Sequence, residues 1–448
     1  MKSLAAILLT LGLLFIFQTC SDDGVDINPI NEGDKGLPAR WADVTLRTVQ
    51  FTFPNSPTYT SRSLGYIGLT MYESVVHGSA NYQSVVSQLN EPPVLPQPES
   101  DKEYNWPIAL NSGQALILKS LYPHAQTDIT ALIDSLELAA YNEEIKTTSM
   151  DVAERSVQYG RAVAEAIYEW SKTDGGHEGY VRNFDPDYVV PTGNGYWIPP
   201  TFGQSVSGLP LHPYWGENRT FLSANAALPA PAIIPFSTDP SSDHYKVFKE
   251  VRDKRYSLSE EDKRIAAWWA DDPTQTASPP GHSYNIATIA ITSAKADMYT
   301  AAEAYAKVGM AVADAFICCW KVKFTYHSGR PFPYIREYID QNYQQFWPEP
   351  PFPAFSSGHA TQSAATATTL TSIFGENFQF VDNTYAGRPA DFEGIQYRSR
   401  TFMTIQETAT ECAYSRFLGG IHTRQDNETG AAQGKSIGEN VVALEWKK

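Results

Sequence analysis

Hydrophobic residues recur at helical spacing along most of the chain. In the segment 57–77, Leu64, Ile67 and Met71 follow one another at steps of three and four residues, which places them on one face of an amphipathic helix. The same periodicity predicts helices over the segments 110–121, 126–141, 149–171, 259–270, 290–325, 359–374, 400–417 and 430–446. We therefore expect an all-α protein, a helical bundle with long irregular loops.

Polar and turn-forming residues mark where these helices begin and end. Ser259 and Asp262 have the spacing of a capping box, and Pro273 stops the helix that follows. Between 172 and 245 neither helical nor strand periodicity persists, so this segment is predicted to be a long loop that covers a site or wraps the bundle. We find no fixed-period repeat and no shift of composition after residue 40, which predicts one helical domain over residues 39–448.

The N-terminal residues have the pattern of an export signal. Lys2 precedes a short apolar run, as in a secretory signal peptide, which we assign to residues 1–19. The run ends before Cys20 in a sequence that resembles the lipobox of bacterial lipoproteins, from which it departs at Phe17 and Gln18. Cys20 is therefore predicted to carry a lipid anchor, with cleavage by the ordinary signal peptidase as the alternative.

Residues 20–38 are predicted to be a linker, because they are rich in Asp, Asn, Gly and Pro. The acidic residues after Cys20 resemble the export tag of surface lipoproteins in the Bacteroidetes. We expect an outer-membrane or cell-surface lipoprotein of such a bacterium, or otherwise a periplasmic or secreted protein. No other run of eighteen or more apolar residues is present, so membrane contact is expected only through a lipid.

Net charge and cysteine content exclude several classes of partner and site. Thirty-four Lys and Arg residues against fifty Asp and Glu residues give a net charge of −16. A chain this acidic lacks the basic surface that phosphate-backbone binding requires, so we expect no nucleic-acid partner. The four cysteines have neither disulfide-framework nor zinc spacing. Cys318 and Cys319 lie in an apolar run and are predicted to pack in the core.

The candidate chemistry is concentrated in residues 320–426, where three short motifs follow one another. They are Lys323 with Arg330-Pro331, then Ser357-Gly358-His359, then Ser415-Arg416 with His422 and Asp426. Each motif alone is commonplace. Together they supply three cations, Lys323, Arg330 and Arg416, that neutralise the oxygens of a tetrahedral oxyanion, and guanidinium groups grip such oxygens in bidentate fashion.

The remaining motif residues complete an oxyanion site. Ser357 offers a hydroxyl and Gly358 a backbone N–H at a helix N-terminus, where the helix dipole favours an anion. His422 is suited to bond the central atom, and His359 is suited to shuttle protons. Asp426 follows His422 by four residues, so we expect it on the same helical face, where it holds the imidazole tautomer.

These motifs closely resemble the signature K-x6-RP, PSGH and SR-x5-H-x3-D of one superfamily. It comprises type 2 phosphatidic acid phosphatases, bacterial acid phosphatases and vanadium-dependent haloperoxidases. One departure is present, because Ser356 replaces the proline of the second part. The resemblance implies the helical bundle of the vanadium haloperoxidase and acid phosphatase type.

The same cage serves either a phosphatase or a haloperoxidase. In a secreted acid phosphatase that hydrolyses phosphate monoesters, the resemblance makes His422 the nucleophile, with Asp426 orienting it and His359 protonating the leaving group. In a haloperoxidase the cofactor is vanadate: His422 is the vanadium ligand, Lys323 polarises bound peroxide, and His359 manages its protons. Residues Lys323, Arg330, Ser357, Gly358 and Arg416 then contact the vanadate oxygens.

Features outside the motifs favour the haloperoxidase. The superfamily's small phosphatases are about half this length or are integral membrane proteins, and the segments 41–47, 57–73 and 352–362 resemble bacterial vanadium haloperoxidases of the iodoperoxidase kind. We therefore predict oxidation of halide by hydrogen peroxide to hypohalous acid. A surface protein that binds an oxyanion without turnover is a third hypothesis, against which the intact His359, His422 and Asp426 argue.

An apolar wall is predicted beside the cage. Trp320, Phe352 and Phe355 flank the motifs and are candidates for a pocket that takes a large, polarisable halide. We expect iodide first and bromide next. The sequence leaves open the organic acceptor and the oligomeric state.

The other histidines are interpreted as surface or packing residues, because they lack ligand spacing. They are His77, His124, His177, His212, His244, His282 and His327. His327 lies between Lys323 and Arg330 in the sequence, near the mouth of the predicted pocket. The pair Asp271-Asp272 is interpreted as a helix-end turn, with stabilisation of a cage arginine or cation binding as alternatives.

Overall fold

The computed structural model describes residues 35–200, 207–273, 275–389 and 394–448. The predicted signal peptide 1–19 and the lipid site at Cys20 lie outside these residues and stay predictions. The predicted linker 20–38 overlaps the first helix, which already begins at Leu37. No helix in the described part of the chain has the length and apolar character needed to cross a membrane.

The described residues are predominantly helical, as the periodicity predicted. Two short strands, β1 (Phe380–Asp382) and β2 (Arg400–Phe402), form an antiparallel pair. Four 3-10 turns are η1 (Val76–Gly78), η2 (Val86–Gln88), η3 (Gly179–Arg182) and η4 (Trp215–Glu217). The α-helices are α1 (Leu37–Phe51), α2 (Pro57–Glu73), α3 (Trp106–Leu121), α4 (Thr127–Glu144), α5 (Met150–Ser171), α6 (Ser223–Ala226), α7 (Asp243–Arg255), α8 (Glu260–Trp268), α9 (Ser278–Ala294), α10 (Met298–Tyr326), α11 (Pro331–Tyr338), α12 (Gly358–Phe374), α13 (Ile405–Leu418) and α14 (Arg424–Val442).

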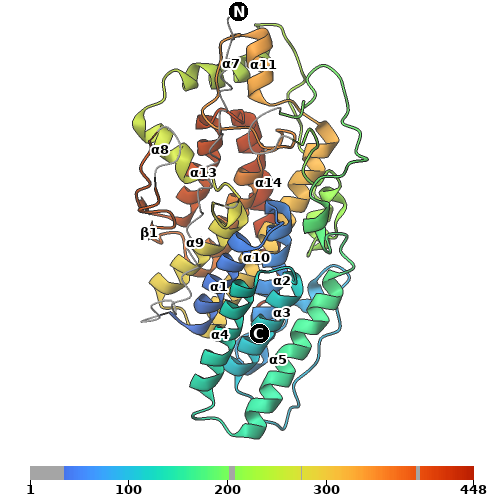
Figure 1. Ribbon diagram of the computed structural model, residues 1–448, viewed down its shortest axis with the longest axis vertical. Helices are drawn as coiled ribbons and strands as arrows, with labels where there is room; N and C mark the ends of the chain where they lie inside the picture. Colours follow the sequence, from blue (N-terminus) through green and yellow to red (C-terminus); the bar gives the residue numbers. More distant parts are fainter. Residues whose placement is uncertain (1–34, 201–206, 274, 390–393) are drawn as a thin grey trace, which may run out of the picture.

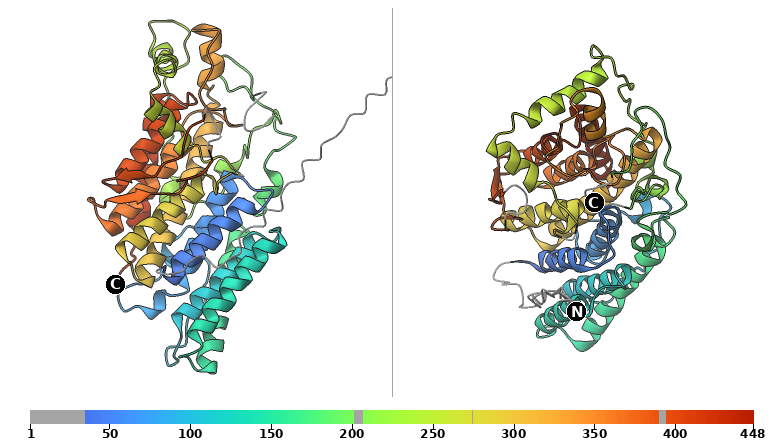
Figure 2. Two further views of the ribbon diagram at one scale, coloured as in Figure 1. Left: turned by 60° about the vertical axis from the view of Figure 1, so that its left-hand side comes forward. Right: turned by 45° about the horizontal axis from the view of Figure 1, so that its top comes forward.

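The helices gather into two groups joined by a central pair. Helices α3, α4 and α5 lie at one end of the elongated molecule, and α12, α13 and α14 lie toward the other (Figure 1). Helices α2 and α10 pack along each other between these groups, as the turned views also show (Figure 2). This pair connects the N-terminal helices to those that carry the motifs. The single domain over 39–448 stays a prediction.

Close approach of helix backbones positions the motif-bearing elements. A Cβ atom on Gly68 of α2 would lie 2.4 Å from the carbonyl oxygen of Tyr305 in α10. A Cβ atom on Gly434 of α14 would lie 1.9 Å from the carbonyl oxygen of Thr361 in α12. Only glycine permits such contact. Helices α12 and α14 are thereby held together next to the ends from which His359 and Asp426 project.

Several elements differ from the sequence predictions. The segment 290–325 was predicted as one helix, but α9 ends at Lys295 in the left-handed conformation, and α10 restarts with Asp297 as its N-cap. Periodicity alone does not detect this break, because apolar residues continue through it. The short helices α7 and α11 and the β1–β2 pair were not predicted. Cys318 and Cys319 are buried in the core, as predicted.

The packing of α12 against α14 leads to a stability prediction. We expect Gly434→Ala to lower the free energy of unfolding by about 1–3 kcal/mol, because its new methyl group overpacks a backbone contact. Thermal and urea unfolding followed by circular dichroism measures the change. Lys435→Ala is the matched control, since its side chain is 69% exposed, and it should change stability by no more than about 0.5 kcal/mol. Equal stability of the two variants would contradict this account of the contact.

Candidate active site

Residues of all three motifs meet around a cavity of about 470 Å³. Gly358, His359, Arg416 and His422 line it directly. Lys323, Arg330 and Ser357 are fully buried beside these residues, and Asp426 is nearly so. The structure thus brings together every cage residue that the motifs predicted.

The Ser357-Gly358-His359 segment forms the start of α12. Ser357 is the N-cap, and its hydroxyl accepts a long hydrogen bond of 3.5 Å from the backbone N–H of Ala360. The N–H of Ser357 donates to the carbonyl of Asp426 at 3.0 Å, which ties this turn to α14. A helix N-terminus presents unpaired N–H groups and a positive dipole end. Gly358 therefore lies where the backbone favours an anion.

Lys323, near the end of α10, holds the loop that leads into this turn. Its Nζ donates to the carbonyl oxygens of Pro353 at 2.9 Å and Ala354 at 2.7 Å, and also to that of Ser356. Full burial lowers the pKa of Lys323, but donation to three carbonyl oxygens favours the protonated ammonium, the only form with three N–H donors. Ser356, which replaces the signature proline, is thus fixed through its carbonyl.

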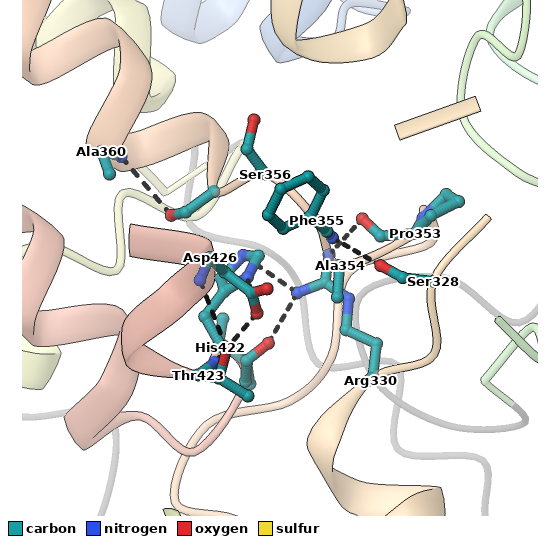
Figure 3. A network of polar contacts seen from close by, with 12 residues as sticks. Ser328, Arg330, Pro353, Ala354, Phe355, Ser356, Ala360, His422, Thr423 and Asp426 are labelled. Carbon is teal, nitrogen blue, oxygen red and sulfur yellow. Dashed lines mark hydrogen bonds and ion pairs between the residues drawn. The ribbon is translucent and has the colours of Figure 1, made fainter. Parts of the chain in front are cut away.

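Arg330 joins two of the motifs. Its guanidinium donates to the carbonyl oxygens of Phe352 at 2.9 Å and Ile421 at 2.9 Å, and Nη1 lies 3.2 Å from Nε2 of His422. Figure 3 shows the guanidinium directed toward His422 and Asp426. Because Arg remains protonated, this contact requires a lone pair on His422 Nε2. That nitrogen is therefore the one suited to bond a central atom.

Asp426 fixes the tautomer of His422. Nδ1 of His422 donates to Oδ2 of Asp426 at 3.2 Å, and the same oxygen accepts from the N–H of Thr423 at 2.9 Å. One detail of the prediction was wrong: His422 is not on the helix. It lies in the turn before the N-cap Thr423, and Asp426 closes a capping box there. The pair meets because the capping box holds the carboxylate against the turn.

Two buried nitrogen atoms at the cavity have no partner in the structure. Nε of Arg416 and Nε2 of His359 are both buried without a hydrogen bond, although Nη1 of Arg416 donates to the carbonyl of Trp269 at 2.6 Å. Leaving such groups unsatisfied costs about 1–3 kcal/mol each. Together with the α12 N-terminus and the lone pair of His422, they fit a tetrahedral oxyanion.

The electrostatic environment keeps both histidines neutral. Burial, with Arg416 as the next cause, holds the pKa of His359 well below 6.5. Burial followed by Arg330 and Lys323 does the same to the pKa of His422. Neighbouring cations and desolvation both disfavour a protonated imidazole. The site therefore presents two neutral bases among three cations.

The apolar wall is only partly as predicted. Trp320 and Phe352 line the cavity, with ring centroids 4.9 Å apart, and Phe316 extends the wall by stacking on Trp320. Phe355 does not line the cavity: it is fully buried and packs edge-on against Tyr326. The intervening residues turn its ring away from the cavity side of the loop.

Residues of the segment 172–245, which was predicted as a loop, cover this region. The segment also contains short helical turns that were not predicted. Asn183, Phe184 and Leu211 line the cavity, and the Leu211 carbonyl accepts from Nε1 of Trp320 at 3.1 Å. The segment also lines a second cavity of about 380 Å³, to which Arg330 contributes as well. His327 does not line the main cavity. It caps α10 in the left-handed conformation, and its carbonyl accepts from the N–H of Trp197.

Sequence reasoning missed a buried polar cluster next to His359. His282 was interpreted as a surface or packing residue, but its ring lies between the carboxylates of Asp271 and Asp382. Oδ2 of Asp271 is 3.9 Å from Nε2 of His359. Asp271 therefore lies at the site and is not only the helix-end turn that the sequence favoured; it also acts on Arg416, as the alternative of a stabilised cage arginine allowed. These residues come from segments far apart in the sequence, so no spacing signal points to them.

The cage geometry predicts the effect of removing one cation. We expect Arg416→Ala to weaken binding of inorganic phosphate at least about tenfold, because a charge-assisted contact is worth about 1.5–3 kcal/mol. Isothermal titration calorimetry on the protein without added metal measures it. Arg424→Ala is the control, since its side chain is 45% exposed and pairs with Glu250. Equal phosphate affinity of the two variants would contradict the assignment of Arg416 to the cage.

Comparison with solved structures gives extensive matches. The chain is 30% identical to a bacterial vanadium-dependent iodoperoxidase, covering 91% of this chain and 97% of that one with a TM-score of 0.77. Apo and holo forms of a bacterial vanadium-dependent chloroperoxidase match at 17% and 16% identity, with TM-scores of 0.65 and 0.64. These cover 87% of this chain and 94% and 93% of theirs, and they show the shared fold.

Comparison of the sequence itself gives one family match. The family model described as the VCPO second helical-bundle domain matches residues 303–348 and 339–447, which contain all three motifs. No curated protein sequence matches the chain. The motif match, the assembled cage and the similarity to the iodoperoxidase over nearly the whole of both chains lead to one conclusion: this chain belongs to the vanadium-dependent haloperoxidase family.

Proposed function

We propose that this enzyme oxidises iodide with hydrogen peroxide, using vanadate held in the cage. The observation that carries the proposal is a pair of buried nitrogen atoms without a partner, Nε of Arg416 and Nε2 of His359, on residues that line the cavity together with His422. A pocket that combines an unpaired guanidinium donor with three cations fits a tetrahedral oxyanion better than water. Membership of the family favours vanadate over a phosphate ester as the occupant, and peroxidase over phosphatase.

The chain's residues have distinct roles toward that cofactor. His422 would hold vanadium through Nε2, because Asp426 accepts from Nδ1. Arg416, Ser357 and the backbone N–H of Gly358 would hold its oxygens. When bound, vanadate supplies a Lewis-acidic centre that activates hydrogen peroxide toward transfer of oxygen to a halide.

Lys323 and Arg330 act through charge. Their hydrogen bonds go to backbone carbonyls of the loop 352–356, to the Ile421 carbonyl and to His422. Backbone carbonyls carry no net charge to cancel the cations. Both residues therefore shape the cage and also leave it with the positive potential that a halide requires in an acidic protein.

His359 is placed to move protons. The overall reaction, H2O2 + X⁻ + H⁺ → HOX + H2O, consumes one proton per turnover. A neutral imidazole accepts a proton from the incoming peroxide and returns it to the departing oxygen. Burial and the neighbouring cations keep the pKa of His359 low, so the base form predominates near neutral pH.

The apolar wall supports iodide as the halide. Trp320, Phe352 and Phe316 form a surface whose side chains offer the cavity no free hydrogen-bond donor, since the Trp320 N–H donates to the Leu211 carbonyl. Iodide is the halide least costly to desolvate beside such a wall and the easiest to oxidise. The related iodoperoxidase structure also supports this choice.

The cofactor requirement is tested by reconstitution. We expect chelator-treated protein to lack peroxide-dependent iodide oxidation and to gain it with orthovanadate, measured as triiodide absorbance. The His422→Ala variant should stay inactive after the same treatment, because it lacks the proposed ligand. A phosphate monoester is assayed alongside. Phosphate release that vanadate inhibits, with no iodide oxidation, would support the phosphatase hypothesis instead.

The halide wall is tested by a matched pair of substitutions on one loop. We expect Phe352→Leu to raise KM for iodide about tenfold, because the flat aromatic face is lost at a cost near 1.4 kcal/mol. Phe355→Leu makes the same change on a ring that points away from the cavity, so KM should change less than about twofold. Steady-state iodide oxidation measures both. A larger effect at Phe355 would contradict the assigned orientations.

A further inference from the structure

A histidine outside the motifs lies buried between two carboxylates. In α9, Nδ1 of His282 donates to Oδ1 of Asp271 at 2.9 Å, and Nε2 donates to Oδ2 of Asp382 at 3.0 Å. Asp271 follows α8 and Asp382 ends β1. The His282 side chain is 1% exposed, and those of Asp271 and Asp382 are 1% and 0% exposed.

Surrounding side chains fix this cluster in one arrangement. The Tyr385 hydroxyl donates to Asp271, and Nε1 of Trp268 donates to Oδ2 of Asp382 at 2.9 Å. The ring of Trp269 stacks on His282 with centroids 4.5 Å apart and planes 20° apart. Reversing the imidazole would put carbon atoms in place of its nitrogens and break both of its hydrogen bonds. The cluster is therefore rigid.

The geometry requires a doubly protonated ring. Each nitrogen faces a carboxylate oxygen, and a carboxylate only accepts, so both nitrogens carry hydrogen. Although burial opposes the charge, the two carboxylates outweigh it and raise the pKa of His282 to about 10. The imidazolium thus balances one of its two carboxylates throughout the neutral range.

This cluster adjoins the proton-transfer histidine. Oδ2 of Asp271 lies 3.9 Å from Nε2 of His359. The other charged or titratable groups that act on His359 are Arg416 on α13, Lys323 on α10, His422 before α14 and His282 itself on α9. Asp271 is the anionic group that lies next to His359. Without a counter-charge, it would favour a protonated His359.

We propose that His282 is a positioning residue for the peroxidase reaction: clamped between Asp271 and Asp382, it fixes the Asp271 carboxylate beside His359 and cancels its charge there. His359 thereby has a fixed carboxylate oxygen 3.9 Å from Nε2 and stays a neutral base. The inference rests on the proposed function only in taking His359 as the group that moves protons. It assigns a role to three residues, from separate elements, that do not belong to the motifs.

The test measures the charge of both histidines directly. Protein labelled with ¹⁵N-histidine and free of vanadate is titrated by NMR, with His282→Gln and His359→Gln used to assign the signals. In the unaltered protein His282 should remain an imidazolium at pH 8, and His359 should remain neutral at pH 6.5. In His282→Gln the pKa of His359 should rise by about one unit or more, because Asp271 is no longer balanced.

Activity gives a second readout with an internal control. The acid limb of kcat/KM for peroxide should move to higher pH in His282→Gln by the same amount, since a base is lost on protonation. Adding Asp271→Asn to that variant should return the limb toward lower pH. His124→Gln removes a half-buried histidine distant in sequence that bonds the Pro54 carbonyl, and it should leave the limb unmoved.

Three results would overturn the proposal. A neutral His282 ring at pH 8 in the unaltered protein would do so even if His282→Gln failed to fold. An unshifted His359 titration in a folded His282→Gln would also do so, as would a uniform loss of activity at all pH values. The NMR titration needs no turnover, so its outcome is separate from any failure of the vanadate proposal.

Discussion

The site depends on buried cations whose hydrogen bonds go largely to backbone carbonyls. Lys323 donates to three carbonyls of the loop before α12, and Arg330 bridges that loop to Ile421 and His422. A carbonyl satisfies the geometry of a charged donor without cancelling its charge. The loop is consequently fixed, the cavity stays positive and both site histidines stay neutral. An anion entering the cavity meets these cations although the whole chain is acidic.

Helix packing supplies the rigidity that such a cage requires. Gly434 lets α14 approach α12 at backbone distance, next to the helix starts that carry Asp426 and His359. The Ser357 N–H then bonds the Asp426 carbonyl across the two helices. Catalytic groups must be held within a fraction of an ångström of their working geometry. Here contacts between the backbones of α12 and α14 set the distance between the turns that carry His359 and His422.

The region around His359 combines two opposing electrostatic effects. Arg416 and Lys323 disfavour its protonation, while the carboxylate of Asp271 would favour it. The imidazolium of His282 offsets the effect of that carboxylate, because its Nδ1 contacts both carboxylate oxygens. A base therefore keeps an anionic neighbour 3.9 Å away without becoming protonated by it. Perturbed groups of this kind are typical of functional sites.

The sequence by itself determined the helical periodicity, the capping boxes and the identities of the cage residues, because these depend on local spacing and on three short motifs. It also gave the chemical reason for their grouping, an oxyanion. Only the tertiary structure decided that Phe352 faces the cavity while Phe355 turns away, and that one expected helix breaks at Lys295. The same holds for His282, Asp271 and Asp382, which lie on separate elements. Contacts between distant segments are set by packing and loop geometry, so local sequence patterns do not predict them.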